Sequence, residues 1–184
     1  MVSAPTDWPV FSLQQLDSAI GQAKTANKYL FIWDKQGSVG TFMQYKGFPV
    51  SLGPEVVKMA LGRQTAEEVG DFIRKGFINS MRTGDNMCLD MDVGEPDFCA
   101  YNKEGTFEAE KFFDHAWMTE RDNYIQFVRE DENHGIGGIN PGNGYVRHRD
   151  YTGVFRTGAE TGEEIMAILG KMPHQEDFLK VIIQ

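Results

Sequence analysis

Cysteine is scarce in this sequence, which contains Cys88 and Cys99 and no others among its 184 residues. Two cysteines cannot build the disulfide framework of a small secreted domain, nor the sulfur ligand set of a structural zinc module. Long apolar runs are also missing, since the longest spans about five residues and a helix that crosses a bilayer needs about 20. The opening residues MVSAPTDWPV lack the basic and apolar regions of a secretory signal, so we expect a cytoplasmic protein.

Positive charge is in short supply as well. Lys and Arg number 18 against 27 Asp and Glu, which gives a formal net charge of −9. A protein that binds nucleic acid or anionic lipid needs a basic surface, so neither nucleic acid nor a membrane is expected as a partner. With 41% hydrophobic residues the chain can fold around its own core, and its length predicts one domain over residues 1–184.

Apolar periodicity and end signals predict the helices. The strongest, over 65–82, begins with a capping box in which Thr65 and Glu68 satisfy each other's backbone N–H groups. A second capping box, Thr161 with Glu164, opens a helix over 161–172. Apolar residues spaced by three and four predict further helices over 13–25, 54–61 and 107–118, and residues 35–53 are expected to be mostly loop.

Short apolar runs predict five strands, at 29–34, 86–93, 124–130, 151–156 and 178–184. Strands that alternate with helices favour an α/β layered fold with a mostly parallel sheet flanked by helices. No helical pattern separates the third and fourth strands, which leaves one antiparallel pair open. A helical lead-in (1–26) precedes the sheet, and residues 131–144, with five glycines and one proline, are expected to form a long loop.

Three aspartates fall at the ends of predicted strands, namely Asp34, Asp90 and Asp92. Ligands of parallel sheets bind beyond the carboxyl ends of the strands, so these residues are the first catalytic or metal-binding candidates. In an enzyme, Asp90 and Asp92 would act as nucleophile and acid/base, the spacing of haloacid-dehalogenase-type phosphatases, and Asp34 with Asp90 would hold Mg²⁺. Val93-Gly94-Glu95 departs from that phosphatase pattern, and solvated acids without chemistry are the alternative.

The residues after Asp34 read KQGSVGTF, a glycine-containing turn in which a nucleotide would be held by Gly37, Gly40 and Thr41. Against the pattern G-x-x-x-x-G-K-[ST], Gly40 takes the place of the second glycine, but Thr41 stands where the lysine is required. Without that lysine the turn offers a phosphate little beyond backbone N–H groups. We therefore expect an ordinary strand-to-helix turn and no cofactor, with Mg²⁺ and ATP or GTP as the alternative.

One local basic cluster, Arg147-His148-Arg149, follows the glycine-rich loop and offers cations to an acidic patch on a partner. Trp8 and Tyr145 fall in expected loop regions, where exposed aromatic side chains can anchor protein partners. A solvated turn and locally packed loop aromatics are the respective alternatives.

The run YLFIWD with its glycine-containing turn, the helix pair in VKMALGRQTAEEVGDFIRKGF and the strand NMCLDMD together resemble the core of a degenerate P-loop NTPase domain of the AAA or kinase-like type. The sequence is also similar in style to small accessory proteins of the ciliary axoneme that keep such a fold without its chemistry. The resemblance implies a non-catalytic structural or interaction subunit of a large cytoplasmic assembly, in the cytoskeleton or a cilium, with protein partners. A microtubule partner would be contacted through Arg147–Arg149. The alternative is a Mg²⁺-dependent nucleotide-binding or phosphoryl-transfer enzyme that uses the strand-end aspartates.

Overall fold

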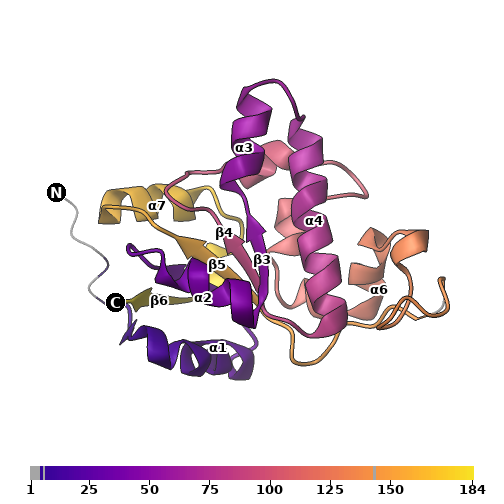
Figure 1. The fold of residues 1–184 in the computed structure, drawn as a ribbon, viewed down its shortest axis with the longest axis horizontal. Coiled ribbons are helices and arrows are strands. Elements are labelled where there is room, and N and C mark those ends of the chain that lie inside the picture. The colour runs from indigo at the N-terminus through magenta and orange to yellow at the C-terminus, as the bar shows by residue number, and fades with distance from the viewer. Residues whose placement is uncertain (1–4, 6, 143) are drawn as a thin grey trace.

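The computed structural model describes residue 5, residues 7–142 and residues 144–184. Over these residues the chain forms a sheet of six parallel strands in the order β1-β6-β2-β5-β4-β3. Helices lie on both sides of this sheet (Figure 1). The expected α/β layered architecture with flanking helices is confirmed.

The strands are short and the helices are unequal in length. The strands are β1 Val10–Phe11, β2 Leu30–Trp33, β3 Phe48–Ser51, β4 Met87–Asp90, β5 Gly153–Thr157 and β6 Leu179–Ile183. The α-helices are α1 Leu16–Thr25, α2 Ser38–Lys46, α3 Gly53–Ala60, α4 Ala66–Thr83, α5 Ala109–Phe112, α6 Arg121–Tyr124 and α7 Gly162–Gly170. Short 3₁₀ turns complete the chain at η1 Leu13–Gln15, η2 Phe98–Tyr101, η3 Trp117–Thr119, η4 Ile125–Phe127, η5 Glu130–Glu132 and η6 Gln175–Asp177.

The connections between strands run along the sheet in two directions. The connections from β1 to β2 and from β2 to β3 run one way, and their helices α1 and α2 pack with Ile32 and Val154 on one face. The later connections run the other way, and α4 and α7 pack on the opposite face with Phe31 and Phe155. Helices on opposite faces follow when every crossover has the same right hand. The connection that leaves β2 goes to α2 on one face, and the connection that leaves its neighbour β5 goes to α7 on the other face, so the switch point of the sheet lies between these two strands.

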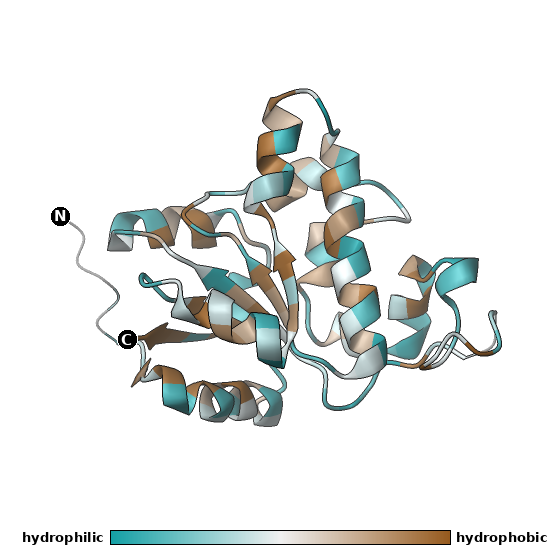
Figure 2. Cartoon of the chain, in the orientation of Figure 1, coloured by the Kyte–Doolittle hydropathy of each residue, from teal (hydrophilic) through white to brown (hydrophobic). Residues whose placement is uncertain are grey.

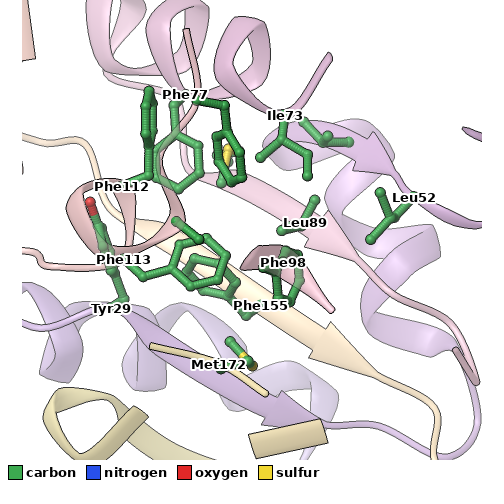
Figure 3. Packing of buried hydrophobic residues seen from close by; sticks show 14 of the residues in the cluster. Tyr29, Leu52, Ile73, Phe77, Leu89, Phe98, Phe112, Phe113, Phe155 and Met172 are labelled. Atoms are coloured by element: carbon green, nitrogen blue, oxygen red, sulfur yellow. The ribbon is translucent and has the colours of Figure 1, made fainter. Parts of the chain in front are cut away.

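The larger core lies on the α4 face and is rich in aromatic rings. Phe77 of α4 lies 5.1 Å from Phe112, and Phe113 lies 5.0 Å from Phe155 of β5, between ring centroids. Figure 3 shows these rings gathered over the sheet with Tyr29 at one side. Such aromatic pairs contribute about 0.5–1.5 kcal/mol each beyond the area they bury. In Figure 2 the strands are coloured mostly as hydrophobic, which fits a sheet covered on both faces.

The longest helix, α4, forms where its capping box predicts it. The Thr65 hydroxyl accepts the Glu68 N–H at 3.2 Å, and the Glu68 carboxylate accepts the Thr65 N–H at 2.7 Å. Gly84 follows the last turn in the left-handed conformation at φ 84°, which glycine adopts without strain. Gly70 lets α4 approach η2 closely, because a Cβ at this position would clash with the Tyr101 carbonyl oxygen.

The strand count and the antiparallel pair differ from the sequence-based expectation. The described residues form six strands rather than five, and every strand pair is parallel. The two strands that the sequence did not indicate, β1 and β3, are the edges of the sheet. β3 contains Pro49, which cannot donate to a ladder and is therefore confined to an edge. The segment 35–53, expected as loop, contains α2 and β3.

Two further segments differ in type or length. Residues 124–130, expected as a strand, contain the end of α6 and the turn η4, because Tyr124 and Phe127 are buried three residues apart, the spacing of a helical turn. The helix expected over 107–118 is reduced to α5 and η3. The Asp114 carboxylate accepts the Trp117 N–H at 2.9 Å and so begins a new turn after α5.

Two expected segments are described only in part. Within the lead-in 1–26, residues 1–4 and 6 lie outside the described residues, and α1 packs on the sheet. Within the glycine-rich loop 131–144, residue 143 lies outside them, and the loop begins in η5. None of the helices among the described residues combines the length and apolar character that crossing a bilayer requires.

His115 is packed against the edge of the larger core. Its ring lies 4.8 Å from the Tyr29 ring in an edge-to-face arrangement. Burial, and secondly the charge of Arg147, lower the pKa of His115 to about 4. The imidazole is therefore neutral in the folded protein at neutral pH.

We expect this histidine to make the protein sensitive to mild acid. In the unfolded chain its pKa is about 6.5, so between about pH 6.5 and pH 4 the unfolded state holds a proton that the folded state lacks. The free energy of unfolding should fall as the pH is lowered across this window. In His115→Phe, which keeps an aromatic ring beside Tyr29, urea unfolding at successive pH values should show a flatter dependence above pH 5. An unchanged dependence would contradict the assignment to His115.

Candidate functional site at the carboxyl edge of the sheet

The candidate site lies at the switch point of the sheet, where β2, β5 and β4 end side by side. Asp34 follows β2, Arg156 lies in β5 and Asp90 ends β4. Asp90 and Arg156 are register partners across the β4–β5 pair. In open α/β sheets this crevice is the usual ligand-binding place. The fold therefore brings the aspartates to one edge of the sheet, as their positions after the strands predict.

Arg156 fills the centre of this edge, and it is only 4% exposed. Its Nη1 donates to Asp90 Oδ1 at 2.9 Å, and its Nη2 donates to the backbone oxygen of Asp34 at 2.7 Å. Its Nε lies 3.5 Å from Asp34 Oδ2 without making a hydrogen bond, and Asp92 Oδ1 lies 3.6 Å from Nη1. The three candidate carboxylates thus surround one guanidinium rather than an open space between the strands.

The Arg156 side chain keeps its positive charge although it is buried. Burial acts to lower its pKa, but the hydrogen bond to Asp90 and the charges of Asp90 and Asp34 outweigh burial and hold the pKa above its ordinary value. One positive charge then faces three carboxylates. The edge remains negative, which is unfavourable for the phosphates of a nucleotide.

Asp34 occupies the place that a phosphate takes in nucleotide-binding turns. Its carboxylate accepts the Val39 N–H at 2.7 Å and the Ser38 hydroxyl at 3.2 Å, at the amino end of α2. A helix amino end attracts anions because its first N–H groups have no partners within the helix. Here the protein's own buried carboxylate, which is 0% exposed, supplies that anion.

The turn residues of the nucleotide hypothesis have structural positions. Gly37 precedes α2 in the left-handed conformation at φ 74°. Gly40 faces β4 so closely that a Cβ would lie 2.7 Å from Asp90 Oδ2. The Thr41 hydroxyl donates to the Gly37 carbonyl oxygen at 3.5 Å, and Lys35 pairs with Glu160 at 2.8 Å. Gly37 allows the left-handed backbone of the turn and Gly40 allows α2 to approach Asp90, which accounts for both glycines without a nucleotide.

Sequence reasoning missed Arg156, although the chain carries a signal for it. The strand VFRT places one charged residue within an otherwise apolar run. A charge in a strand that is covered on both faces has to be paired, and the strand-end aspartates are the available partners. If the chain held Mg²⁺ through Asp34 and Asp90, the cation would have to displace the guanidinium from these carboxylates.

Comparisons with protein-family models, with curated proteins and with solved structures returned no match to this chain.

The three side chains of the basic cluster at 147–149 make different contacts. The Arg147 guanidinium turns inward and lies 5.3 Å from the Tyr151 ring, with Nη2 donating to the Tyr151 carbonyl oxygen at 3.4 Å. The His148 ring packs against Gly84 at the end of α4. The Arg149 side chain, 91% exposed, points to solvent beside Asp150. The three side chains nevertheless border a hollow of about 460 Å³ under the glycine-rich loop.

The aromatic side chains proposed as anchors are packed locally instead. Tyr145 is fully buried, and its hydroxyl donates to the Ile78 carbonyl oxygen at 2.7 Å. Trp8 is partly buried and lies 5.9 Å from the Phe31 ring in an edge-to-face arrangement. The expectation that Tyr145 is exposed is therefore wrong, because its side chain lies within the larger core, whereas Trp8 is only partly buried against that core.

A buried ion-pair network on α4 was also missed from the sequence. Arg74, 1% exposed, donates from Nε to Asp71 at 2.7 Å and from both Nη atoms to Glu132 at 2.6 and 2.8 Å. Its Nη1 also reaches the Phe127 carbonyl oxygen at 3.0 Å. Burial alone would raise the pKa of Glu132, but the hydrogen bonds and charge of Arg74 lower it below its usual value. Arg74 thereby ties the start of the glycine-rich loop to α4.

One further group of possible metal ligands occurs in the described residues. Donor atoms of His174, Glu176 and Asp177 lie within 4.8 Å of one another. His174 is half-buried and also lies 3.4 Å from Glu110, whereas the two acids are exposed. Exposed acidic groups of this kind are common without a bound ion, so the group carries no assignment here.

Proposed function

We propose that the chain is a non-catalytic interaction subunit of a larger protein assembly. The observation that carries this proposal is Arg156, whose buried guanidinium donates to the Asp90 carboxylate and to the Asp34 carbonyl oxygen at the place where an α/β enzyme would bind its ligand. In this proposal Arg156 stabilises the edge of the sheet, and the exposed Asp92 is a solvated acid.

Exposed apolar side chains support the same proposal. Val57, Leu61 and Val93 are 58%, 62% and 64% exposed near the ends of β3 and β4, and Ile136 and Ile139 are 67% and 69% exposed in the glycine-rich loop. Apolar side chains that gather on a surface mark contacts with other molecules. The cytoplasmic setting, and the cytoskeleton or cilium as its place, rest on the resemblance of the sequence to axonemal accessory proteins.

Calorimetry with Mg²⁺ and ATP or GTP tests the proposal against the nucleotide alternative. We expect no heat of binding, because the Asp34 carboxylate accepts the Val39 N–H at the amino end of α2 and Arg156 donates to the Asp90 carboxylate. Micromolar binding that is abolished in Asp90→Asn would overturn the proposal in favour of a nucleotide-binding enzyme. Asp92→Asn serves as the second variant, since Asp92 is exposed and has φ 52°, a conformation that asparagine tolerates. Nucleotide binding that is lost in this variant too would overturn the proposal equally.

A further inference from the structure

An apolar groove opens beside the carboxyl ends of β3 and β4. Its volume is about 460 Å³, and it lies between α3 and the loop that joins β4 to η2. The apolar residues at its floor and walls are Leu52, Val56, Met59, Met91, Pro96 and Tyr101. Two methionines suit a surface that adapts to the side chains of a ligand, because methionine is flexible and polarizable.

The apolar surface continues outside the hollow. Val57 and Val93 line the groove from its two sides and stand more than half exposed. Leu61 follows Val57 by one helical turn and extends the same face of α3. Figure 2 shows the hydrophobic colouring of α3, which projects beyond the sheet in Figure 1. A surface of this extent suits a segment of polypeptide rather than a compact small molecule.

The rim of the groove is acidic. Asp92, Glu95 and Asp97 all lie on the β4–η2 loop and line the groove, and all three are exposed. Of the described residues that line it, none is Lys or Arg. Two cations approach this rim from outside the groove: Lys171 lies 3.3 Å from Glu95, and Arg156 lies 3.6 Å from Asp92. The Asp97 carboxylate accepts the Cys99 N–H and has no ion pair among the described residues. Such a rim repels anionic lipid and attracts basic side chains.

We propose that this groove binds an amphipathic segment of a partner protein, with apolar side chains in the groove and Lys or Arg side chains against the acidic rim. The inference rests on the proposed function, because it names the surface through which an interaction subunit would engage its assembly. The apolar floor of the groove would contact the apolar side chains of the segment, and the acidic rim would pair with its Lys or Arg side chains, so shape and charge together select the partner.

The probe is a fluorescently labelled synthetic peptide of leucine and lysine, about four helical turns long, which we call the lysine peptide. Its counterpart, the glutamate peptide, has the same pattern with glutamate in place of each lysine. Fluorescence anisotropy with the full chain should show saturable binding of the lysine peptide and none of the glutamate peptide. Equal binding of both peptides, or binding of neither, overturns the inference.

Val57→Lys and Met166→Lys form the matched pair of variants. Both residues are exposed helix residues, at 58% and 54%, and both changes add one positive charge, but Met166 lies on α7 and does not line the groove. Val57→Lys should weaken peptide binding about tenfold, whereas Met166→Lys should leave it within about twofold. Equal weakening by both variants would mean general attraction of a basic peptide to an acidic chain, which overturns the groove assignment.

Two further measurements complete the test. Asp92→Asn should weaken binding of the lysine peptide by a few fold and reduce its salt dependence, and an unchanged salt dependence counts against the rim. Sedimentation of the chain alone should show a monomer. Self-association that Val57→Lys abolishes would mean that a second copy of the chain occupies the groove, and this result would overturn the inference. Circular dichroism confirms that each variant is folded. Since nucleotide calorimetry tests the proposed function separately, failure of the groove and failure of that function are distinguishable.

Discussion

Replacing Arg156 with methionine is expected to lower the free energy of unfolding by about 3–5 kcal/mol, because the change removes one partner of a buried ion-pair network. Methionine fills a similar volume and leaves Asp34 and Asp90 without the guanidinium that lies between them. Asp34 is 0% exposed, so water cannot replace the lost contact without opening the edge of the sheet. Urea unfolding at pH 7 measures the change.

A control variant separates this loss from the general effect of removing an arginine side chain. Arg149→Met is the control, since that side chain is 91% exposed and its loss should change stability by no more than about 0.5 kcal/mol.

The second large effect is expected at Arg74. Arg74→Met removes the bidentate contact with Glu132 and the bond to Asp71, which leaves two acids around a buried position. We expect a loss of about 3–5 kcal/mol in the free energy of unfolding. We also expect faster proteolysis within residues 133–142, because Arg74 ties the base of the glycine-rich loop to α4.

Arg129→Met is the matched control for Arg74. Arg129 also pairs with Asp71, at 2.7 Å, but its side chain is 47% exposed, so its loss should amount to about 1 kcal/mol or less. The pH dependence gives a second readout. Burial acts to raise the pKa values of Asp71 and Glu132, but Arg74 holds both below their usual values. The contribution of these ion pairs to the free energy of unfolding is therefore fully present above about pH 4.5, and it is lost as the pH falls through the pKa values of the two acids in the folded protein. Arg74→Met should lose this acid sensitivity, and equal effects of the two variants would contradict the anchoring role.

Elements with local signals could be predicted from the sequence, and elements that depend on tertiary pairing could not. The capping boxes at Thr65 and Thr161 locate α4 and α7 because their hydrogen bonds join residues three apart. β1 is only two residues long and exists through its pairing with β6, which no local pattern records. Aromatic and β-branched residues misled the interpretation of 124–130, since a short apolar run can be a strand or a helical turn.

The candidate site could likewise be predicted only in part from the sequence. Asp34, Asp90 and Asp92 could be brought to one edge from their positions after apolar runs, because parallel strands end on the same side of a sheet. The partner that occupies them comes from β5, more than sixty residues after Asp90 in the sequence. β5 lies between β2 and β4 because of the strand order, which the sequence does not indicate. From the sequence one could predict that Arg156 pairs with an acidic residue, but not which one.

The place of β6 in the sheet has a consequence for how the protein is made. β6 lies between β1 and β2, so β1 has no strand to pair with until residues 179–183 have left the ribosome. β6 is separated in the sequence from both of its neighbours in the sheet, β2 and β1, by about 150 residues or more, and such distant pairing slows folding. Until β6 has been synthesised, apolar residues of α1 and β2 remain exposed, and a chaperone that binds nascent chains could bind to them.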